Sequence, residues 1–330
     1  MKKENEKRLM LTAPELQRVF GGGDNHIRRI EKELHVEIID RDGELKILGT
    51  GSAPARAADL ILSLARDHGE DPDEQRVNYG IDLARSGESA EAMETVDADV
   101  ICHTVNGKPV RPKTLGQKAY VDAIRKHLIV FGIGPAGTGK TYLAMAMAIT
   151  AFLHNEVSRI ILTRPAIEAG EKLGFLPGDL QSKVDPYLRP LYDALYQIMG
   201  AENYLKNSER GLIEVAPLAY MRGRTLDNAY IILDEAQNTT PEQMKMFLTR
   251  VGFGSKVVIT GDATQKDLMP GAKSGLDVAR AVLKGIDDIA FCELTGRDVV
   301  RHPLVQKIVR AYEDYESKHR GDRSREKRKH

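Results

Sequence analysis

Eight residues near the middle of the chain combine flexible glycine backbone with one lysine and two threonines. They fit the pattern G-x-x-x-x-G-K-[ST] and are Gly134, Pro135, Ala136, Gly137, Thr138, Gly139, Lys140 and Thr141. Glycines let backbone N–H groups wrap phosphates, Lys140 adds positive charge at the β- and γ-oxygens, and the Thr141 hydroxyl is a Mg²⁺ ligand. The apolar run 128–133 precedes the segment and a helical pattern follows it. This strand–loop–helix context predicts a P-loop in which all eight residues bind a nucleotide.

Two adjacent carboxylates follow a second apolar stretch, Tyr230–Leu233. Asp234 fits the second magnesium ligand, and Glu235 is placed to orient and polarise the attacking water. A third apolar stretch ends in Thr260-Gly-Asp-Ala-Thr-Gln265, from which Gln265 is predicted to reach the γ-phosphate. Lys140, Glu235 and Gln265 are therefore the candidate catalytic groups for hydrolysis of ATP.

Two other nucleotide chemistries can be compared with the same segments. A GTPase would need [NT]-K-x-D to recognise guanine, and residues 264–267 hold those letters in the wrong order. A small-molecule kinase normally has no catalytic glutamate beside the magnesium aspartate. ATP hydrolysis is therefore preferred, with phosphoryl transfer to a metabolite as the weaker alternative.

The order of the three segments resembles the first RecA-like domain of superfamily 1 helicases. Upstream, Thr114-Leu-Gly-Gln117 followed by Tyr120 resembles an adenine-reading Q motif, which implies that Gln117 binds the nucleotide. By the same resemblance, Arg164-Pro165 is expected near a loop that faces nucleic acid. The helicase-like motifs imply an ATPase that remodels single-stranded RNA or an RNA–protein complex.

Further segments make the resemblance more specific. They are residues 163–165, 170–179, 220–225 and 295–303. Joined to DEAQN and GDATQ, they resemble the PhoH family of phosphate-starvation-inducible ATPases over nearly the whole chain. This resemblance implies one RecA-like ATPase domain, a hexamer, RNA as partner and an RNA-processing protein as a further partner. Some relatives carry a PIN nuclease domain, but this sequence lacks a spaced aspartate cluster of domain length, so no nuclease activity is expected.

No second RecA-like lobe is expected downstream of the motifs. Only 28 residues follow His302, whereas a second core needs about 150. An arginine from a neighbouring subunit would then complete the ATP site, which predicts a ring. Arg297 and Arg301 are the candidates for sensor and trans-acting arginine, and Arg222 and Arg224 are the competing pair. Either pair could instead form surface ion pairs.

A three-layer α/β fold of the P-loop NTPase class is needed to position these residues. We expect a mostly parallel sheet with helices on both faces over residues 103–316. Residues 1–68 are predicted to form a small α+β KH-like domain, because a helical pattern is followed by two alternating stretches around Asp42-Gly43. A KH clamping loop needs GXXG. Here Asp24 replaces the last glycine, which puts RNA binding by this loop in doubt and leaves an adaptor or oligomerisation module as the other interpretation.

The net charge of zero conceals two opposite segments. The chain has 48 basic and 48 acidic residues, but residues 69–100 hold 10 acidic and 2 basic ones, and residues 317–330 hold 7 basic and 2 acidic ones. We therefore expect an acidic linker over 69–102, with a helix near 75–85, and a disordered basic tail over 317–330. The tail is either an RNA or partner contact or a solubilising end.

Helical spacing also marks Leu188, Leu191, Leu195 and Met199 as one apolar face. Simple packing explains such a face; the functional interpretations are a subunit contact, which is favoured, or a nucleic-acid element at a pore. Two cysteines exclude a disulfide framework and a multi-cysteine zinc site. The charged amino terminus is no secretory signal, and the longest near-apolar run, 142–153, is too short to span a membrane, so a cytoplasmic protein is expected.

An ATP-gated binding scaffold that does no unwinding is the alternative to the remodelling ATPase.

Overall fold

The chain forms two compact units in its computed structural model. The structure describes residues 4–22, 25–66, 71–88, 91–165, 180–269 and 271–300, together with residues 304, 305, 308 and 311. Unit 1 comprises the residues up to Glu94 and the described residues from Val300 onward, and unit 2 is Thr95–Val299. The predicted basic tail, 317–330, lies outside the described residues.

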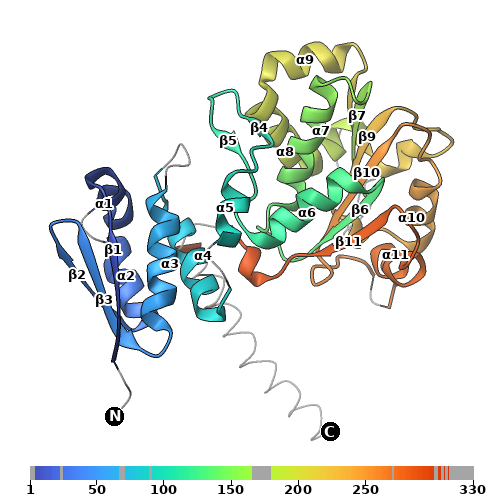
Figure 1. Cartoon of the computed structure of the whole chain (residues 1–330). Helices are drawn as coiled ribbons and strands as arrows, with labels where there is room; N and C mark the ends of the chain where they lie inside the picture. Colours follow the sequence, from blue (N-terminus) through green and yellow to red (C-terminus); the bar gives the residue numbers. More distant parts are fainter. Residues whose placement is uncertain are drawn as a thin grey trace, which may run out of the picture. The chain divides into compact units, whose positions relative to one another are not determined.

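A six-stranded sheet forms the centre of unit 2 (Figure 1). Its strands are β6 (Ile129–Ile133), β7 (Arg159–Arg164), β8 (Ile213–Pro217), β9 (Ala229–Leu233), β10 (Lys256–Gly261) and β11 (Ile289–Glu293). The order is β11-β6-β10-β9-β7-β8, and every neighbouring pair is parallel. The three strands that carry the predicted nucleotide motifs, β6, β10 and β9, are therefore neighbours, and their carboxyl ends meet at one edge.

Helices cover both faces of this sheet (Figure 1). One face carries α6 (Leu115–Lys126), α7 (Lys140–Leu153), α8 (Leu180–Met199) and α9 (Ala201–Glu209), and the other carries α10 (Pro241–Leu248) and α11 (Gly275–Leu283). In β9, Tyr230 and Ile232 face the α7 side, whereas Ile231 and Leu233 face the α10 side. Strands buried on both faces read as continuous apolar runs. The predicted three-layer α/β fold is confirmed.

The remaining elements of unit 2 are short. A two-stranded sheet pairs β4 (Cys102–His103) with β5 (Pro109–Val110). Single 3₁₀ turns follow the carboxyl ends of three strands: η3 (Leu218–Met221) after β8, η4 (Ala236–Asn238) after β9, and η5 (Gly296–Asp298) after β11. These turns help to set the path of the chain at the edge where the motifs lie.

Helix α8 contains the apolar face that the sequence favoured as a subunit contact. Leu188, Leu191, Leu195 and Met199 are all buried in the core cluster that α8 shares with α7, α9 and the sheet. The favoured interpretation is therefore wrong for these four residues. Their helical spacing reflects packing inside unit 2, which is the simple-packing interpretation that the pattern also allowed.

Unit 1 is a small α+β unit, as predicted. Its elements are β1 (Glu4–Met10), α1 (Ala13–Phe20), α2 (Asn25–Leu34), β2 (Val36–Arg41), β3 (Glu44–Thr50), α3 (Ala53–Ala65) and α4 (Glu74–Ser86). The antiparallel sheet has the order β1-β3-β2. Asp42 and Gly43 both have positive φ, which suits the tight turn predicted between β2 and β3. Residues Gly23 and Asp24 of the candidate clamping loop lie outside the described residues.

The helix expected within the acidic segment is α4. Its apolar residues Val77, Ile81 and Ala84 are buried, and the helix packs on α2 and α3. The acidic side chains dominate the composition of the segment, but the apolar stripe decides where the helix lies. This part of the segment thus belongs to the core of unit 1, and α5 (Glu91–Asp97) spans the division between the units.

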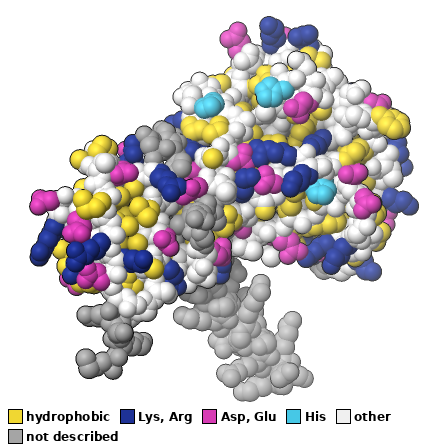
Figure 2. Space-filling view, viewed as in Figure 1, with side chains coloured by type: hydrophobic (Ala, Val, Ile, Leu, Met, Phe, Trp, Pro, Cys, Tyr) yellow, Lys and Arg dark blue, Asp and Glu magenta, His cyan; other side chains and the backbone are white. Residues whose placement is uncertain are grey.

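Charges of both signs are spread over the visible surface (Figure 2). Lysine and arginine side chains lie interspersed with aspartate and glutamate side chains on unit 2, as the balanced composition implies. Both cysteines, Cys102 and Cys292, are free thiols. Within the described part of the chain, no helix has the length and apolar character needed to cross a membrane.

Candidate nucleotide site

A cavity of about 280 Å³ opens at the carboxyl edge of the parallel sheet. Residues from the P-loop, from the end of β9 and from the segment after β10 line it together: Ala136, Gly137, Gly139, Lys140, Thr141, Tyr142, Asp234, Glu235, Gly261, Asp262 and Gln265. Ligand sites of open α/β sheets lie at this edge. The structure thus brings together the three motifs that the sequence singled out.

The P-loop connects β6 to α7 in the predicted order. Gly137 and Gly139 have φ values of +85° and +76°, a left-handed conformation that glycine adopts without strain. The Lys140 ammonium donates to the carbonyl oxygens of Gly134 (2.6 Å) and Pro135 (2.8 Å). The backbone of the loop therefore surrounds the Lys140 ammonium. Its N–H groups lie just before the amino end of α7, where the helix dipole favours anions.

Asp234 lies directly behind the P-loop threonine. The Thr141 hydroxyl donates to Asp234 Oδ1 at 2.7 Å, and the Thr260 hydroxyl donates to the same oxygen at 2.5 Å. The Asp234 side chain is almost fully buried. A hydroxyl and a carboxylate at this separation are the hard oxygen ligands that Mg²⁺ prefers, so the donor set fits a magnesium ion.

Arg164 at the end of β7 reaches the same carboxylate. Its Nε and Nη2 atoms donate to Asp234 Oδ2 at 2.7 and 2.5 Å, and Nη2 lies 3.5 Å from Glu235 Oε1. The expectation that Arg164 lies near a nucleic-acid-facing loop did not foresee this contact. It follows from the sheet, because β7 pairs with β9 in a register that sets Thr163 opposite Leu233. The sequence singled out Arg164 but did not predict its ion pair with Asp234.

Glu235 is held beside Asp234 by an unusual backbone conformation. Its φ of 55° and ψ of 38° are left-handed, which is uncommon for a residue with a side chain. The Gln237 amide donates to Glu235 Oε2 at 2.6 Å and accepts from the Asp262 N–H at 2.9 Å. Gln237, which sequence reasoning missed, therefore links the predicted general base to the segment after β10.

That segment contacts the P-loop through Asp262. The buried carboxylate accepts from the Ala136 N–H at 3.1 Å and from the Thr264 backbone and hydroxyl at 2.9 and 2.6 Å. Gln265, the predicted γ-phosphate sensor, is exposed and is one of the residues that line the cavity. Its contact with the γ-phosphate stays a prediction.

Gln117 lies against the outer side of the P-loop. Its side chain is buried, donates to the Thr138 carbonyl at 3.1 Å and accepts from the Lys113 N–H at 2.7 Å. Both ends of the amide are thus bound to backbone, and Gln117 does not line the cavity described above. In this structure its hydrogen bonds position the loop.

The arginines proposed to complete the site have different surroundings. Arg297 is exposed in η5, at the same edge of the sheet as the P-loop but outside the cavity lining. Arg301 lies outside the described residues. Of the competing pair, Arg224 forms two 2.7 Å contacts with Glu214, whereas Arg222 is exposed. Within this chain, neither Arg222 nor Arg224 lines the cavity.

Comparison with known proteins gives the same family throughout. The family model described as PhoH-like protein matches residues 109–313. A PhoH-like protein of Bacillus subtilis is 54% identical over 298 residues, which cover 89% of this chain and 93% of the relative. A PhoH-like protein of Synechocystis is 52% identical, covering 90% of this chain and 91% of the relative. The Escherichia coli protein PhoH is 45% identical over 206 residues, 62% of this chain and 58% of the relative. With a P-loop, a buried carboxylate pair and a parallel sheet that joins them, the chain belongs to the PhoH family of P-loop NTPase-like proteins.

Proposed function

We propose that this protein hydrolyses ATP to ADP and phosphate in a magnesium-dependent reaction. The observation that carries the proposal is the direct contact between Thr141 and Asp234, with Glu235 beside them at the mouth of the cavity. A phosphate-binding loop alone would serve any nucleotide-binding protein. The adjacent carboxylate that is half exposed and aimed by Gln237 is what favours hydrolysis.

Each residue has a defined role in this proposal. The Lys140 ammonium leaves its loop carbonyls to bind β- and γ-phosphate oxygens, and the loop N–H groups bind the rest of the phosphate chain. Thr141 and Asp234 would hold the metal, which when bound would neutralise charge on the phosphate chain. Glu235 accepts a proton from the attacking water, and Gln265 contacts the γ-phosphate.

The proposed reaction is tested by nucleotide binding and phosphate release with the full-length protein. We expect magnesium-dependent release of phosphate from ATP, lost in Lys140→Ala and retained in Lys245→Ala, which changes an exposed lysine on α10. With γ-labelled ATP, the label should appear as inorganic phosphate. Label found on an added small acceptor would support the metabolite kinase and contradict hydrolysis.

We further propose that the ATPase forms a ring and acts on single-stranded RNA. The helicase-like order of motifs supports RNA, and the 7 basic residues within 317–330 offer a local attachment for a chain whose net charge is zero. Single-stranded RNA at low salt should raise the hydrolysis rate, and removal of residues 317–330 should weaken RNA association without changing basal hydrolysis. An unchanged rate with RNA would favour the ATP-gated scaffold.

The ring is supported by the expected need for a completing arginine, since the described residues that line the cavity include no arginine. Mixing two inactive variants tests it directly. Lys140→Ala chains retain Arg297, and Arg297→Ala chains retain an intact P-loop. If Arg297 acts in trans, mixed rings regain up to about one quarter of wild-type turnover, because mixed interfaces restore complete sites. Mixtures that stay inactive, while both variants still assemble, would exclude Arg297 as the trans-acting group.

A further inference from the structure

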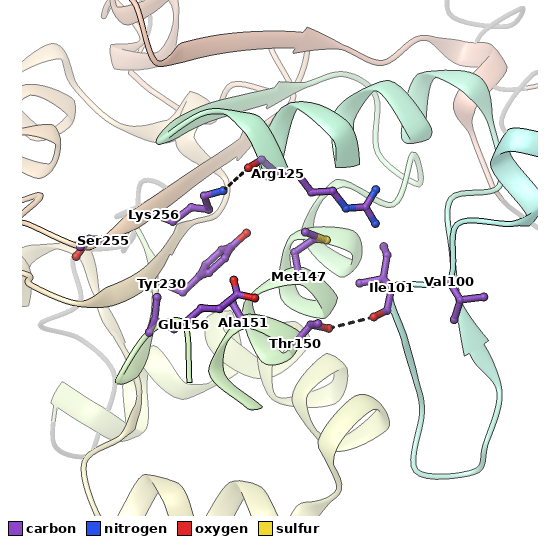
Figure 3. A pocket seen from close by; sticks show the side chains of 12 residues that line it. Val100, Ile101, Arg125, Met147, Thr150, Ala151, Glu156, Tyr230, Ser255 and Lys256 are labelled. Carbon is purple, nitrogen blue, oxygen red and sulfur yellow. Dashed lines mark hydrogen bonds between the residues drawn. The ribbon is translucent and has the colours of Figure 1, made fainter. Parts of the chain in front are cut away.

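A second and larger cavity, of about 470 Å³, lies at the opposite edge of the sheet in unit 2 (Figure 3). The carboxyl end of α6, the second half of α7 and the first residues of β9 and β10 surround it. Its volume falls within the range of small-molecule sites. None of the residues that line it lines the cavity at the P-loop. We call it the amino-edge pocket.

Tyr230 extends into the amino-edge pocket, and its hydroxyl has no partner (Figure 3). The side chain is 1% exposed, and among the described residues no atom forms a hydrogen bond with this hydroxyl. Burial raises the pKa of Tyr230 well above its ordinary value, so the group keeps its proton and can donate. A buried hydroxyl without a partner costs free energy, and native proteins normally satisfy such groups with protein, water or ligand.

The two cationic side chains of the pocket already have hydrogen-bond or ion-pair partners. Arg125 binds Asp99 through two contacts of 2.6 and 2.7 Å and also contacts Asp122 at 3.1 Å. The Lys256 ammonium donates to the carbonyl oxygens of Ile124 and Arg125 at the end of α6. Both cations are therefore engaged, which does not suit a phosphate ligand.

Glu156 is the acidic side chain of the pocket lining that remains available as an acceptor. Its carboxylate acts electrostatically on both Tyr230 and Lys256, and His154 Nδ1 lies 3.9 Å from Glu156 Oε1. The Glu156 side chain is 66% exposed, so it lies at the open rim, whereas Tyr230 lies at the closed inner end. A ligand that fits must accept from Tyr230 and donate N–H groups to Glu156.

The walls between these two groups are apolar. Ile101, Met147, Ala151 and Val157 line the pocket, and the Arg125 guanidinium lies across from Glu156 (Figure 3). Methionine sulfur and guanidinium planes both make favourable contacts with flat rings. The body of the ligand is therefore flat, uncharged and largely apolar, with an acceptor and a donor on one edge.

We propose that the amino-edge pocket binds a nucleobase, with its hydrogen-bonding edge between Tyr230 and Glu156. Guanine fits best, because its O6 can accept from the tyrosine while its N1–H and N2–H groups lie side by side for a carboxylate. The base can come from a free nucleoside or from an unpaired position in an RNA strand. This site does not depend on the ATPase proposed above.

The test is titration of the full-length protein with guanosine, adenosine, cytidine and uridine, followed by calorimetry or ligand-observed NMR. We expect saturable binding of guanosine, more weakly of the others, and an unchanged affinity in Lys140→Ala, which separates this pocket from the P-loop. Tyr230→Phe removes one hydrogen bond and should weaken guanosine about tenfold. Glu156→Gln should weaken guanosine by at least as much and reduce its advantage over uridine.

Two matched variants control for general effects. Tyr220→Phe and Glu209→Gln change exposed residues away from the pocket and should bind guanosine as the wild type does. Because the Tyr230 hydroxyl has no partner, Tyr230→Phe should unfold at the same temperature as wild type or higher. The source of the base is tested by competition with a short oligoribonucleotide that contains guanosine. If it displaces bound guanosine at a lower concentration than free guanosine does, RNA is the source of the base. If it does not, the free nucleoside is the source.

Three results would overturn the proposal. The first is no saturable nucleoside binding up to millimolar concentration. The second is binding that Tyr230→Phe and Glu156→Gln both leave unchanged. The third is a crystal structure grown with guanosine in which only an ordered water contacts Tyr230.

Discussion

Asp234 is the residue of the nucleotide site that accepts hydrogen bonds from three neighbouring side chains. Its two carboxylate oxygens accept hydrogen bonds from Thr141, Thr260 and Arg164, and the side chain is nearly inaccessible to solvent. A buried carboxylate needs compensating charge. In the structure Arg164 provides it, and the proposed metal would provide it in the active complex. In the proposed active complex, Arg164 and Mg²⁺ would thus be alternative partners of this carboxylate.

This competition predicts the behaviour of Arg164→Ala. The variant should be less stable than wild type by about 3 kcal/mol, because it leaves a buried carboxylate without its ion pair. Millimolar Mg²⁺ should raise its melting temperature by more than it raises that of wild type. Thermal unfolding with and without magnesium measures both effects.

Arg159→Ala is the matched control, because Arg159 lies at the other end of β7 and donates to the Asp227 carbonyl instead. Its gain from magnesium should equal that of wild type. An equal gain for Arg164→Ala would show that Arg164 does not shield the metal site.

Strand β6 must approach β11 closely where the P-loop begins. A Cβ atom at Gly134 would lie 2.4 Å from the Leu294 carbonyl oxygen, which is backbone and cannot move aside cheaply. The Leu294 N–H in turn donates to the Ile133 carbonyl at 2.8 Å. Glycine at this position therefore sets the path of the loop through the packing of two strands.

Gly134→Ala is expected to lower the free energy of unfolding by about 1–3 kcal/mol and to weaken nucleotide binding. Denaturant unfolding and nucleotide titration measure the two effects. Gly296→Ala is the control at the same edge, because a Cβ atom there meets nothing within 4 Å. If both variants behave as wild type, the close approach of β6 to β11 does not constrain the loop.

The elements with strong local patterns were predictable from the sequence. Continuous apolar runs identified β6, β9 and β10, and the motifs at their ends identified Thr141, Asp234 and Glu235 as neighbours. Arg164 and Gln237 were not predictable in their observed roles, because these depend on which strands pair and in what register. The apolar face of α8 was visible, but spacing alone does not say whether such a face meets its own core or another chain.

Weakly acidic side chains that burial keeps protonated make the free energy of unfolding of the whole molecule decrease at alkaline pH. Burial raises the pKa of the Cys292 thiol to about 11 and that of Tyr230 further. The folded state holds these protons at a pH where the unfolded chain has released them. The free energy of unfolding is therefore highest below the ordinary thiol pKa and falls as pH rises from about 8.5 toward 11.

Cys292→Ala should reduce the loss of unfolding free energy between pH 7.5 and pH 10 by about 1 kcal/mol. This value allows for the partial exposure of the thiol. The measurement is denaturant unfolding of both proteins at pH 7.5 and at pH 10. Comparing the two pH values within each protein removes the effect of the smaller side chain on packing. The same drop in both proteins would mean that Cys292 does not contribute.

The most direct test of the account concerns Glu235 in the full-length protein. Glu235→Gln keeps the size of the side chain and its possible contact with Gln237 but removes the group that accepts the proton. We predict that the variant binds ATP with magnesium as tightly as wild type and that its rate of phosphate release falls at least about 100-fold. Glu242→Gln, on the exposed first turn of α10, should match wild type in both measurements. Phosphate release by Glu235→Gln at the wild-type rate would contradict the proposed mechanism.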